Sequence, residues 1–163
     1  MSKIRFPARP LPLLARATAD TTQRQLRELL DRNEITALVD RLGRALDEGH
    51  FDDFQTLYTP DATAKTPGGK AEGRDALTAQ ARRNHSADKR IQHFISNVMI
   101  DLDNDKAEVR ANLIATFAPS TGTISEPQYT LGEIYRFDAI RTATGWRLSR
   151  VETTPIWSTG TRP

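Results

Sequence analysis

The spacing of apolar residues changes part-way along the chain, and this change limits the fold more than any other feature. From Thr22 to about residue 86 many of them recur at three- and four-residue steps, the period of helices that pack one face on a core. From Arg90 onward they alternate with polar residues, the period of strands. Helices followed by an antiparallel meander predict an α+β fold, a cone in which a strongly bent sheet wraps the helices.

The first half predicts three helical segments. Capping-box patterns begin at Thr22 and Asp31, so either two helices meet near Asp31 or one helix runs through it. The apolar stripe that follows ends at Gly49 and consists of Ile35, Leu38, Val39, Leu42, Ala45 and Leu46. The remaining elements are a short helix over 51–58 stopped by Pro60, a strand over 62–66, a turn over 66–70 and a helix over 74–86.

The second half predicts four long strands, over 90–102, 106–118, 127–141 and 144–157. One face of the first strand mixes polar and apolar side chains, as ligand pockets do: His93, Ile95, Asn97 and Met99. Its other face is apolar: Phe94, Ser96, Val98, Ile100 and Leu102. On the second strand, Val109, Leu113 and Phe117 fit either a core or an interface. One face of the third strand is mainly aromatic and contains a single carboxylate, Glu133. Its residues are Tyr129, Leu131, Glu133, Tyr135 and Phe137.

Composition removes several kinds of chemistry. The chain has 163 residues, the size of one domain, and no cysteine, which excludes disulfides, thiolate metal sites and a cysteine nucleophile. The three histidines are His50, His85 and His93, and no two of them have the HxH or HExxH spacing of a metal site. A histidine-rich metal site is therefore not expected, although one histidine with carboxylates would still allow one, and we predict no metal. His93 is the main candidate base, while His50 and His85 fit a loop and a helix end.

The positive charge is concentrated at the N-terminus. Residues 1–20 carry a surplus of three positive charges, while the rest holds 19 positive and 20 negative side chains. A near-neutral body argues against nucleic-acid binding, and no apolar run is long enough to span a membrane. We expect a flexible or docking arm over 1–20, one domain over 21–158 and a tail over 159–163. Without a convincing secretory signal, we expect a cytoplasmic protein.

Several segments together resemble one known family. They are Arg44-Ala-Leu-Asp47-Glu-Gly-His-Phe-Asp-Asp53, Leu57-Tyr-Thr-Pro-Asp61-Ala62, Glu72-Gly-Arg-Asp-Ala76, Gln92-His93-Phe-Ile-Ser-Asn97 and Gly145-Trp-Arg147. In order and spacing they resemble the SnoaL-like group of the nuclear transport factor 2-like superfamily, from about Asp31 to Glu152. The resemblance implies a cone-shaped barrel around a deep apolar pocket, and assembly as a homodimer or homotrimer. The superfamily includes enzymes, ligand binders and structural subunits.

The resemblance also implies a catalytic pair. Scytalone dehydratase and hexachlorocyclohexane dehydrochlorinase, which belong to this group, carry an aspartate and a histidine at positions that match Asp47 and His93. Two features of such enzymes are missing here: a second pocket histidine on the following strand, and tyrosines where this chain has Leu42 and Leu46. Substrate-binding partners would then be Tyr58, Asn97, Glu133 and Tyr135.

Each of these residues also has a purely structural interpretation. Asp47 continues a polar line of Thr36, Asp40 and Gly43 that by itself reads as a solvated helix face. Glu133 can equally pair with Arg110 or Arg136, and the two tyrosines can be core rings.

The resemblance, with these residues, implies a small-molecule lyase, isomerase or cyclase. His93 would remove an acidic proton, Asp47 would orient it, and an amide or a tyrosine hydroxyl would hold the developing oxyanion. The substrate would be apolar and polyketide-, terpenoid- or steroid-like, the reaction a dehydration, double-bond shift or ring closure, and no cofactor is needed. The alternative is a non-catalytic ligand-binding or assembly subunit on the same fold.

Overall fold

The computed structural model describes residues 13–85, 88–122 and 124–161. One long helix, α1 (Leu13–Glu48), is followed by a 3₁₀ turn η1 (Phe51–Asp53) and by α2 (Phe54–Leu57). The strands are β1 (Tyr58–Thr66), β2 (Gly69–Glu72), β3 (Lys89–Asp103), β4 (Lys106–Pro119), β5 (Tyr129–Thr142) and β6 (Gly145–Gly160), with α3 (Arg74–Asn84) between β2 and β3. The predicted α+β order is confirmed.

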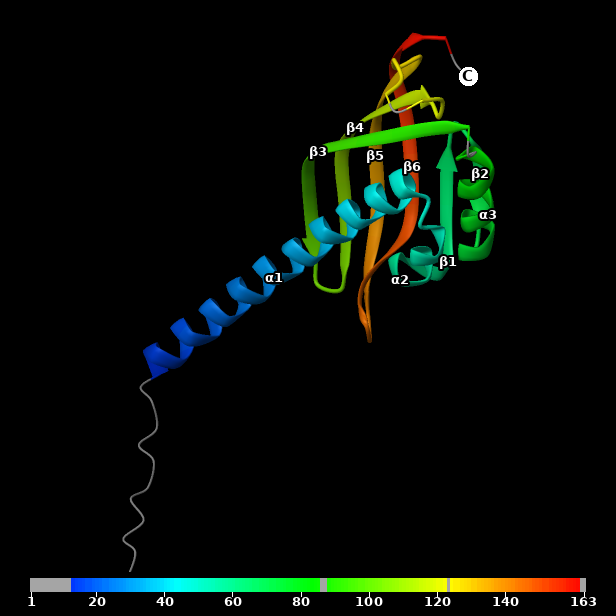
Figure 1. Cartoon of the computed structure of the whole chain (residues 1–163). Coiled ribbons are helices and arrows are strands. Elements are labelled where there is room, and N and C mark those ends of the chain that lie inside the picture. The colour runs from blue at the N-terminus through cyan, green and yellow to red at the C-terminus, as the bar shows by residue number, and fades with distance from the viewer. Residues whose placement is uncertain (1–12, 86–87, 123, 162–163) are drawn as a thin grey trace, which may run out of the picture.

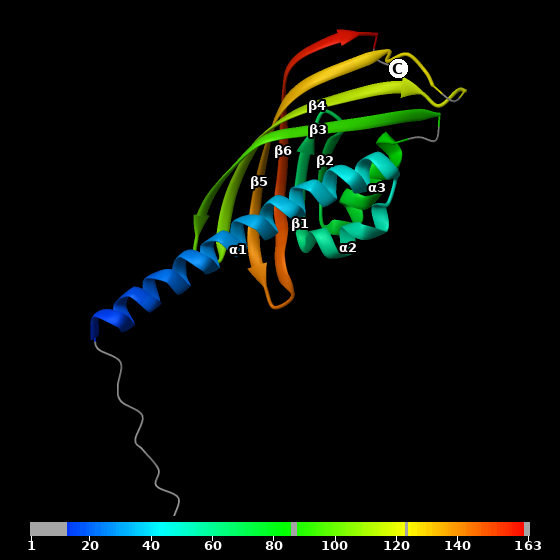
Figure 2. The same ribbon diagram turned by 60° about the vertical axis from the view of Figure 1, so that its left-hand side comes forward.

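The strands form one six-stranded sheet in the order β2-β1-β6-β5-β4-β3. The pairs from β3 to β6 are antiparallel, as predicted, whereas β1 runs parallel to β6. The sheet bends around the C-terminal half of α1 and around α3, with β3 at its free edge (Figures 1 and 2). The concave face therefore encloses a space that the helices cover from one side.

Helix α1 is a single helix that runs through Asp31, so the alternative of two helices meeting there is wrong. It begins at Leu13, nine residues before the predicted start at Thr22, so part of the expected arm is helical. Thr22 does not cap it, because its hydroxyl donates to the Thr18 carbonyl one turn back at 3.0 Å. Residues 1–12 of the expected arm and residues 162–163 of the expected tail lie outside the described residues.

The C-terminal half of α1 supplies the core. The predicted stripe is confirmed, because five of its members are at most 1% exposed: Ile35, Leu38, Val39, Leu42 and Ala45. They pack on the concave side of the sheet, where Val109, Leu113, Phe137, Trp146 and Leu148 are buried. Val109 and Leu113 are therefore core residues of β4.

The N-terminal half of α1 extends beyond the sheet (Figure 1). Leu26, Leu29 and Leu30 on this half are 54–64% exposed. Phe94, Met99 and Ile114 are exposed on β3 and β4. Exposed apolar side chains of this size are typical of surfaces that meet a partner. The homodimer or homotrimer expected from the resemblance stays a prediction.

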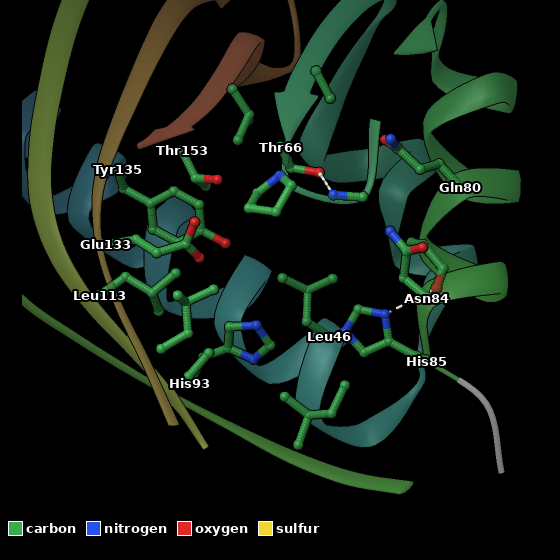
Figure 3. Close-up of a pocket in the computed structure, with 18 of the residues that line it drawn as sticks. Leu46, Thr66, Gln80, Asn84, His85, His93, Leu113, Glu133, Tyr135 and Thr153 are labelled. Carbon is green, nitrogen blue, oxygen red and sulfur yellow. Dashed lines mark hydrogen bonds between the residues drawn. The ribbon is translucent and has the colours of Figure 1, made fainter. Parts of the chain in front are cut away.

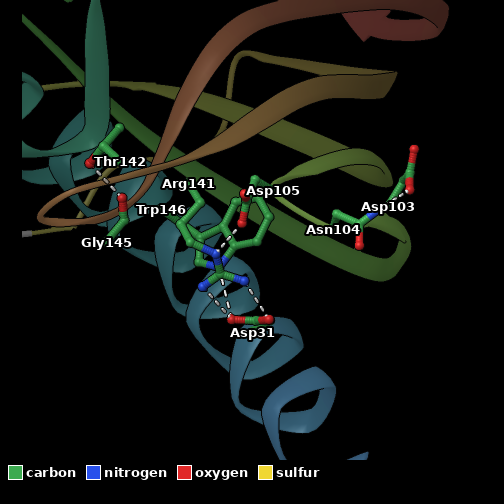
Figure 4. Close-up of polar contacts among 8 residues, drawn as sticks. All are labelled: Asp31, Asp103, Asn104, Asp105, Arg141, Thr142, Gly145 and Trp146. Atoms are coloured by element: carbon green, nitrogen blue, oxygen red, sulfur yellow. Dashed lines mark hydrogen bonds and ion pairs between the residues drawn. The ribbon is translucent and has the colours of Figure 1, made fainter. Parts of the chain in front are cut away.

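An ion-pair cluster fixes the middle of α1 to the sheet (Figure 4). The Arg141 guanidinium donates to both Asp31 carboxylate oxygens, at 2.7 and 2.5 Å, and to Asp105 at 2.8 Å. It lies 4.6 Å from the centre of the Trp146 ring, whose Nε1 donates to Asp31 at 3.2 Å. One buried carboxylate thus joins α1 to β5, β6 and, through Arg141, the β3–β4 turn.

Candidate active site

Asp47 and His93 meet where the last turn of α1 crosses β3. His93 Nδ1 lies 2.6 Å from Asp47 Oδ1, and the backbone N–H of His93 donates to the same oxygen at 2.9 Å. The His93 side chain is 8% exposed and that of Asp47 is 26% exposed. The two residues predicted as a catalytic pair are therefore in direct contact.

A close approach between α1 and β3 makes this contact possible. Gly43 is buried, and a Cβ atom there would lie 3.2 Å from Ile95 Cδ1. Asp47 follows Gly43 by one helical turn, and His93 precedes Ile95 by two residues on the same face of the strand. The polar line predicted on α1 is therefore not a uniform solvated face. Asp40 is exposed, whereas Asp47 faces the sheet and contacts His93.

The contact selects a histidine tautomer. A carboxylate accepts hydrogen bonds, so the hydrogen of a neutral His93 ring lies on Nδ1. Nε2 then carries the lone pair, and His93 lines the main cavity. A histidine held in this way can take a proton at Nε2, and the carboxylate stabilises the imidazolium that forms.

The cavity has a volume of about 600 Å³, within the range of small-molecule pockets. Figure 3 shows side chains from α1, α3 and the sheet converging on it. Much of its wall is apolar, including Leu42, Leu46, Phe54, Leu77, Leu113 and Val151. Polar groups face the same space: His85, His93, Glu133, Tyr58, Tyr135 and Thr153. Such a cavity fits an apolar molecule that carries a few oxygen atoms.

Tyr58 and Tyr135 are buried, at 4% and 5% exposure. Burial raises the pKa of both phenols, and each is raised further by a neighbour, Tyr135 for Tyr58 and Glu133 for Tyr135. The hydroxyls therefore keep their protons and can donate hydrogen bonds to an oxygen in the cavity.

Glu133 on β5 is 8% exposed, and its Oε1 has no hydrogen-bond partner among the described residues. Burial raises the pKa of this carboxyl, and the Thr153 hydroxyl and the charge of His93 oppose the change. The Thr153 oxygen also lacks a hydrogen-bond partner in the described chain, so burial is the stronger influence. Arg110 and Arg136, its alternative partners, occupy alternate positions of β4 and β5, on the opposite face of the sheet.

Comparison with known proteins now identifies the family, because residues 27–152 match the SnoaL-like domain. The chain belongs to the SnoaL-like family. An uncharacterized protein of Mycobacterium tuberculosis is 30% identical to it over 141 residues, which span 84% of this chain and 94% of that protein.

Solved structures share the nuclear transport factor 2-like fold of this SnoaL-like chain. A putative scytalone dehydratase from Novosphingobium aromaticivorans has a TM-score of 0.72 at 22% identity, with 83% of this chain and 91% of that one covered. A hexachlorocyclohexane dehydrochlorinase of type 2 has a TM-score of 0.72 at 17% identity, with 85% and 93% covered. The resemblance noted in the sequence is therefore confirmed, and at these identities the two structures establish the fold.

Asn97 does not line the cavity of this SnoaL-like domain. It is exposed, with φ of 54°, at a break in the β3–β4 register between Ser96 and Met99. This bulge shifts the strand by one residue, so Val98, Ile100 and Leu102 pack on the core and Met99 is exposed. The predicted face of β3 is therefore correct through Ile95 and wrong beyond it.

His85 lies at the C-terminal end of α3, as predicted, and it also lines the cavity. Its Nδ1 lies 2.9 Å from the Ala81 carbonyl, and its ring stacks on His93 with centroids 6.0 Å apart. Burial lowers the pKa of His85, which keeps the ring neutral. The SnoaL-like chain thus has a second cavity histidine directly after α3 rather than on the strand after His93. The four-residue steps from Leu77 to Ala81 and His85 were the available signal.

Within residues 13–85, 88–122 and 124–161, no three or more His, Asp or Glu residues gather in a way that could hold a metal ion. None of the helices in these ranges has both the length and the apolar character needed to cross a bilayer.

Proposed function

We propose that this SnoaL-like protein is a small-molecule lyase, isomerase or cyclase in which His93 is the general base. The observation that carries the proposal is the 2.6 Å contact between His93 Nδ1 and Asp47 Oδ1 at the wall of a cavity of about 600 Å³. An imidazole whose Nδ1–H is held by a carboxylate can accept a proton at Nε2.

In the proposed reaction, His93 Nε2 removes a proton from a carbon next to a carbonyl group. The electron pair moves toward the carbonyl oxygen, which needs hydrogen-bond donors as it becomes negative. Tyr58 and Tyr135 supply buried hydroxyls in the same cavity. The carbanion equivalent then loses a leaving group, takes the proton back at another carbon or closes a ring, and none of these outcomes requires a cofactor.

The cavity wall supports an apolar substrate of the polyketide, terpenoid or steroid kind. Leucine, phenylalanine and valine side chains cover much of the wall, and polar side chains such as His93, Glu133 and Tyr135 interrupt it. This pattern positions a carbon skeleton by shape and its oxygens by single hydrogen bonds.

Proton exchange tests the proposal without knowledge of the natural substrate. 1-Indanone and 2-cyclohexenone would be incubated with the protein in D₂O, and deuterium uptake next to the carbonyl followed by NMR. We expect wild type to exceed the buffer rate and His93→Ala to lose about 10²- to 10⁴-fold, the usual contribution of a general base.

His50→Ala is the matched control, since His50 is 58% exposed and pairs with Glu48 at the surface. It should exchange like wild type. A His93→Ala variant that remains folded and exchanges like wild type would refute the proposal. If wild type binds the ketones without exchange above buffer, the non-catalytic ligand-binding alternative is favoured.

A further inference from the structure

Glu133 and His93 face the same cavity from strands that are two positions apart in the sheet. His93 pairs with Ala115 on β4, and Leu113, two residues before Ala115, pairs with Glu133 on β5. Adjacent strands lie about 4.8 Å apart, so the two backbones are separated by about 10 Å. Both side chains lie on the concave side of the sheet and line the same cavity, with Leu113 between them (Figure 3).

Glu133 is buried without a charged partner. Its side chain forms no ion pair among the described residues, the Thr153 hydroxyl lies beside it, and Oε1 is left without a hydrogen-bond partner. A buried carboxylate without a partner is costly, whereas a carboxylic acid carries no charge to desolvate. Such a group in a wall that already holds a base is well placed to give up a proton.

We propose that Glu133 is the general acid of this site and that the substrate is a β-hydroxy carbonyl compound, from which the protein eliminates water. The inference rests on the proposed role of His93 as the base. It narrows the reaction to dehydration and assigns the second proton transfer.

The proposed step is balanced. His93 Nε2 takes the proton from the carbon between the carbonyl and the hydroxyl-bearing carbon, and the C–H electron pair forms the C=C bond. The C–O bond breaks, and the departing oxygen keeps its electron pair and takes the proton of Glu133, so that water leaves. The site then holds imidazolium and carboxylate, and transfer of one proton from His93 to Glu133 restores it.

The identity of the leaving group decides whether such an acid is needed. Hydroxide is a poor leaving group and must be protonated as it departs, whereas acetate departs as a stable anion. Burial also raises the pKa of Glu133, which favours the protonated form that the step uses. The titratable groups that act on Glu133 or lie beside it are His93 on β3, Tyr135 on its own strand and Tyr58 on β1, with Asp47 behind His93.

Two probes with one carbon skeleton test the proposal. 4-Hydroxy-4-phenylbutan-2-one and its acetate ester both give 4-phenylbut-3-en-2-one, whose ultraviolet absorbance reports elimination. For Glu133→Gln we expect a loss of about 100-fold or more in water elimination and a change within about threefold in acetate elimination. His93→Ala should lose both reactions. Glu108→Gln, the same change at an exposed position of β4, should lose neither.

Each other outcome overturns the proposal. Equal losses on both probes would make Glu133 a structural or carbonyl-binding group. Wild type that eliminates acetate but not water would leave His93 as a base without an acid. Wild type that eliminates neither would reject the substrate class, while deuterium exchange still decides the role of His93.

A direct titration keeps the test independent of turnover. In protein labelled with ¹³C at glutamate carboxyls, the resonance missing from Glu133→Gln belongs to Glu133. We expect it to titrate above the ordinary glutamate pKa of about 4.3. Titration at or below that value would overturn the proposal. Thermal melts of both glutamine variants show whether they fold as wild type does.

Discussion

Helix α1 contains two aspartates, Asp31 and Asp47, that each join it to the sheet through different kinds of side chain. Asp31, in the middle of the helix, is 6% exposed and meets the guanidinium of Arg141 and the indole of Trp146. Asp47, in the last turn, meets the imidazole and backbone N–H of His93 beside a cavity. The same type of side chain on one helix thus binds an arginine away from the cavity and a histidine at the cavity wall.

The difference lies in what the partner can do with a proton. Arginine stays protonated at every physiological pH, so the Asp31 pair is a permanent ionic clamp. Histidine gains and loses a proton near neutrality, and Asp47 occupies one of its two nitrogens. We infer that the Asp31 cluster determines how firmly α1 is held, and that the Asp47 pair determines what the cavity can do.

The largest expected effect tests this division on the reaction rate. Asp47→Asn removes the charge that stabilises the imidazolium, and we expect a loss of about 10²- to 10³-fold in deuterium exchange. Asp31→Asn should stay within about threefold of wild type at a temperature where both are folded. Comparable rate losses in the two variants would show that the division is wrong.

The next effect concerns the free energy of unfolding, for which we expect Asp31→Asn to have the larger effect and Asp47→Asn the smaller one. Asp31→Asn removes the buried carboxylate that pairs with Arg141, and we expect a loss of about 2–3 kcal/mol, less than for a fully buried pair because Arg141 is 31% exposed and still pairs with Asp105. Asp47→Asn keeps the amide oxygen as an acceptor and should cost about 1 kcal/mol or less. Urea unfolding curves of the two variants and of the exposed control Asp40→Asn measure the difference.

The smallest effect concerns pH. Hydrogen bonds from Arg141 hold the pKa of Asp31 below its ordinary value. Because the folded pKa is the lower one, the pair stabilises the fold fully above the ordinary aspartate pKa of about 3.9, and this contribution is lost as the pH falls through the folded pKa. The unfolding free energies of wild type and Asp31→Asn, measured from pH 7 to pH 2.5, should therefore converge. A gap that stays constant over this range would contradict the account.

Much of the fold could be predicted from periodicity, because burial on one face imposes it. The stripe from Ile35 to Ala45 and the four long strands follow this rule. The start of α1 at Leu13 does not, since residues 18–30 are exposed and no buried face imposes a period on this half of the helix. Strand β2 is four residues with one buried side chain, too short to show alternation.

The candidate site could be predicted in part for similar reasons. The pairing of Asp47 with His93 was predicted from the resemblance. The two residues are 46 positions apart in the sequence, so no local pattern indicates that they are in contact. The face of β3 was predicted correctly up to the bulge at Asn97, whose left-handed backbone nothing in the alternation reveals. His85 was missed because its role depends on where α3 ends relative to β3.

The hydrogen bond from the His93 backbone to Asp47 has a consequence for the behaviour of the chain in solution. β3 is a 15-residue strand at the end of the sheet, and such edges invite strand addition and aggregation. Asp47 occupies a backbone donor that an incoming strand would use, and the bulge beyond it breaks the regular ladder. The Asp47 carboxylate that orients His93 therefore also hinders the addition of another strand to β3. Both the solubility of the protein and the reactivity of His93 then depend on Asp47.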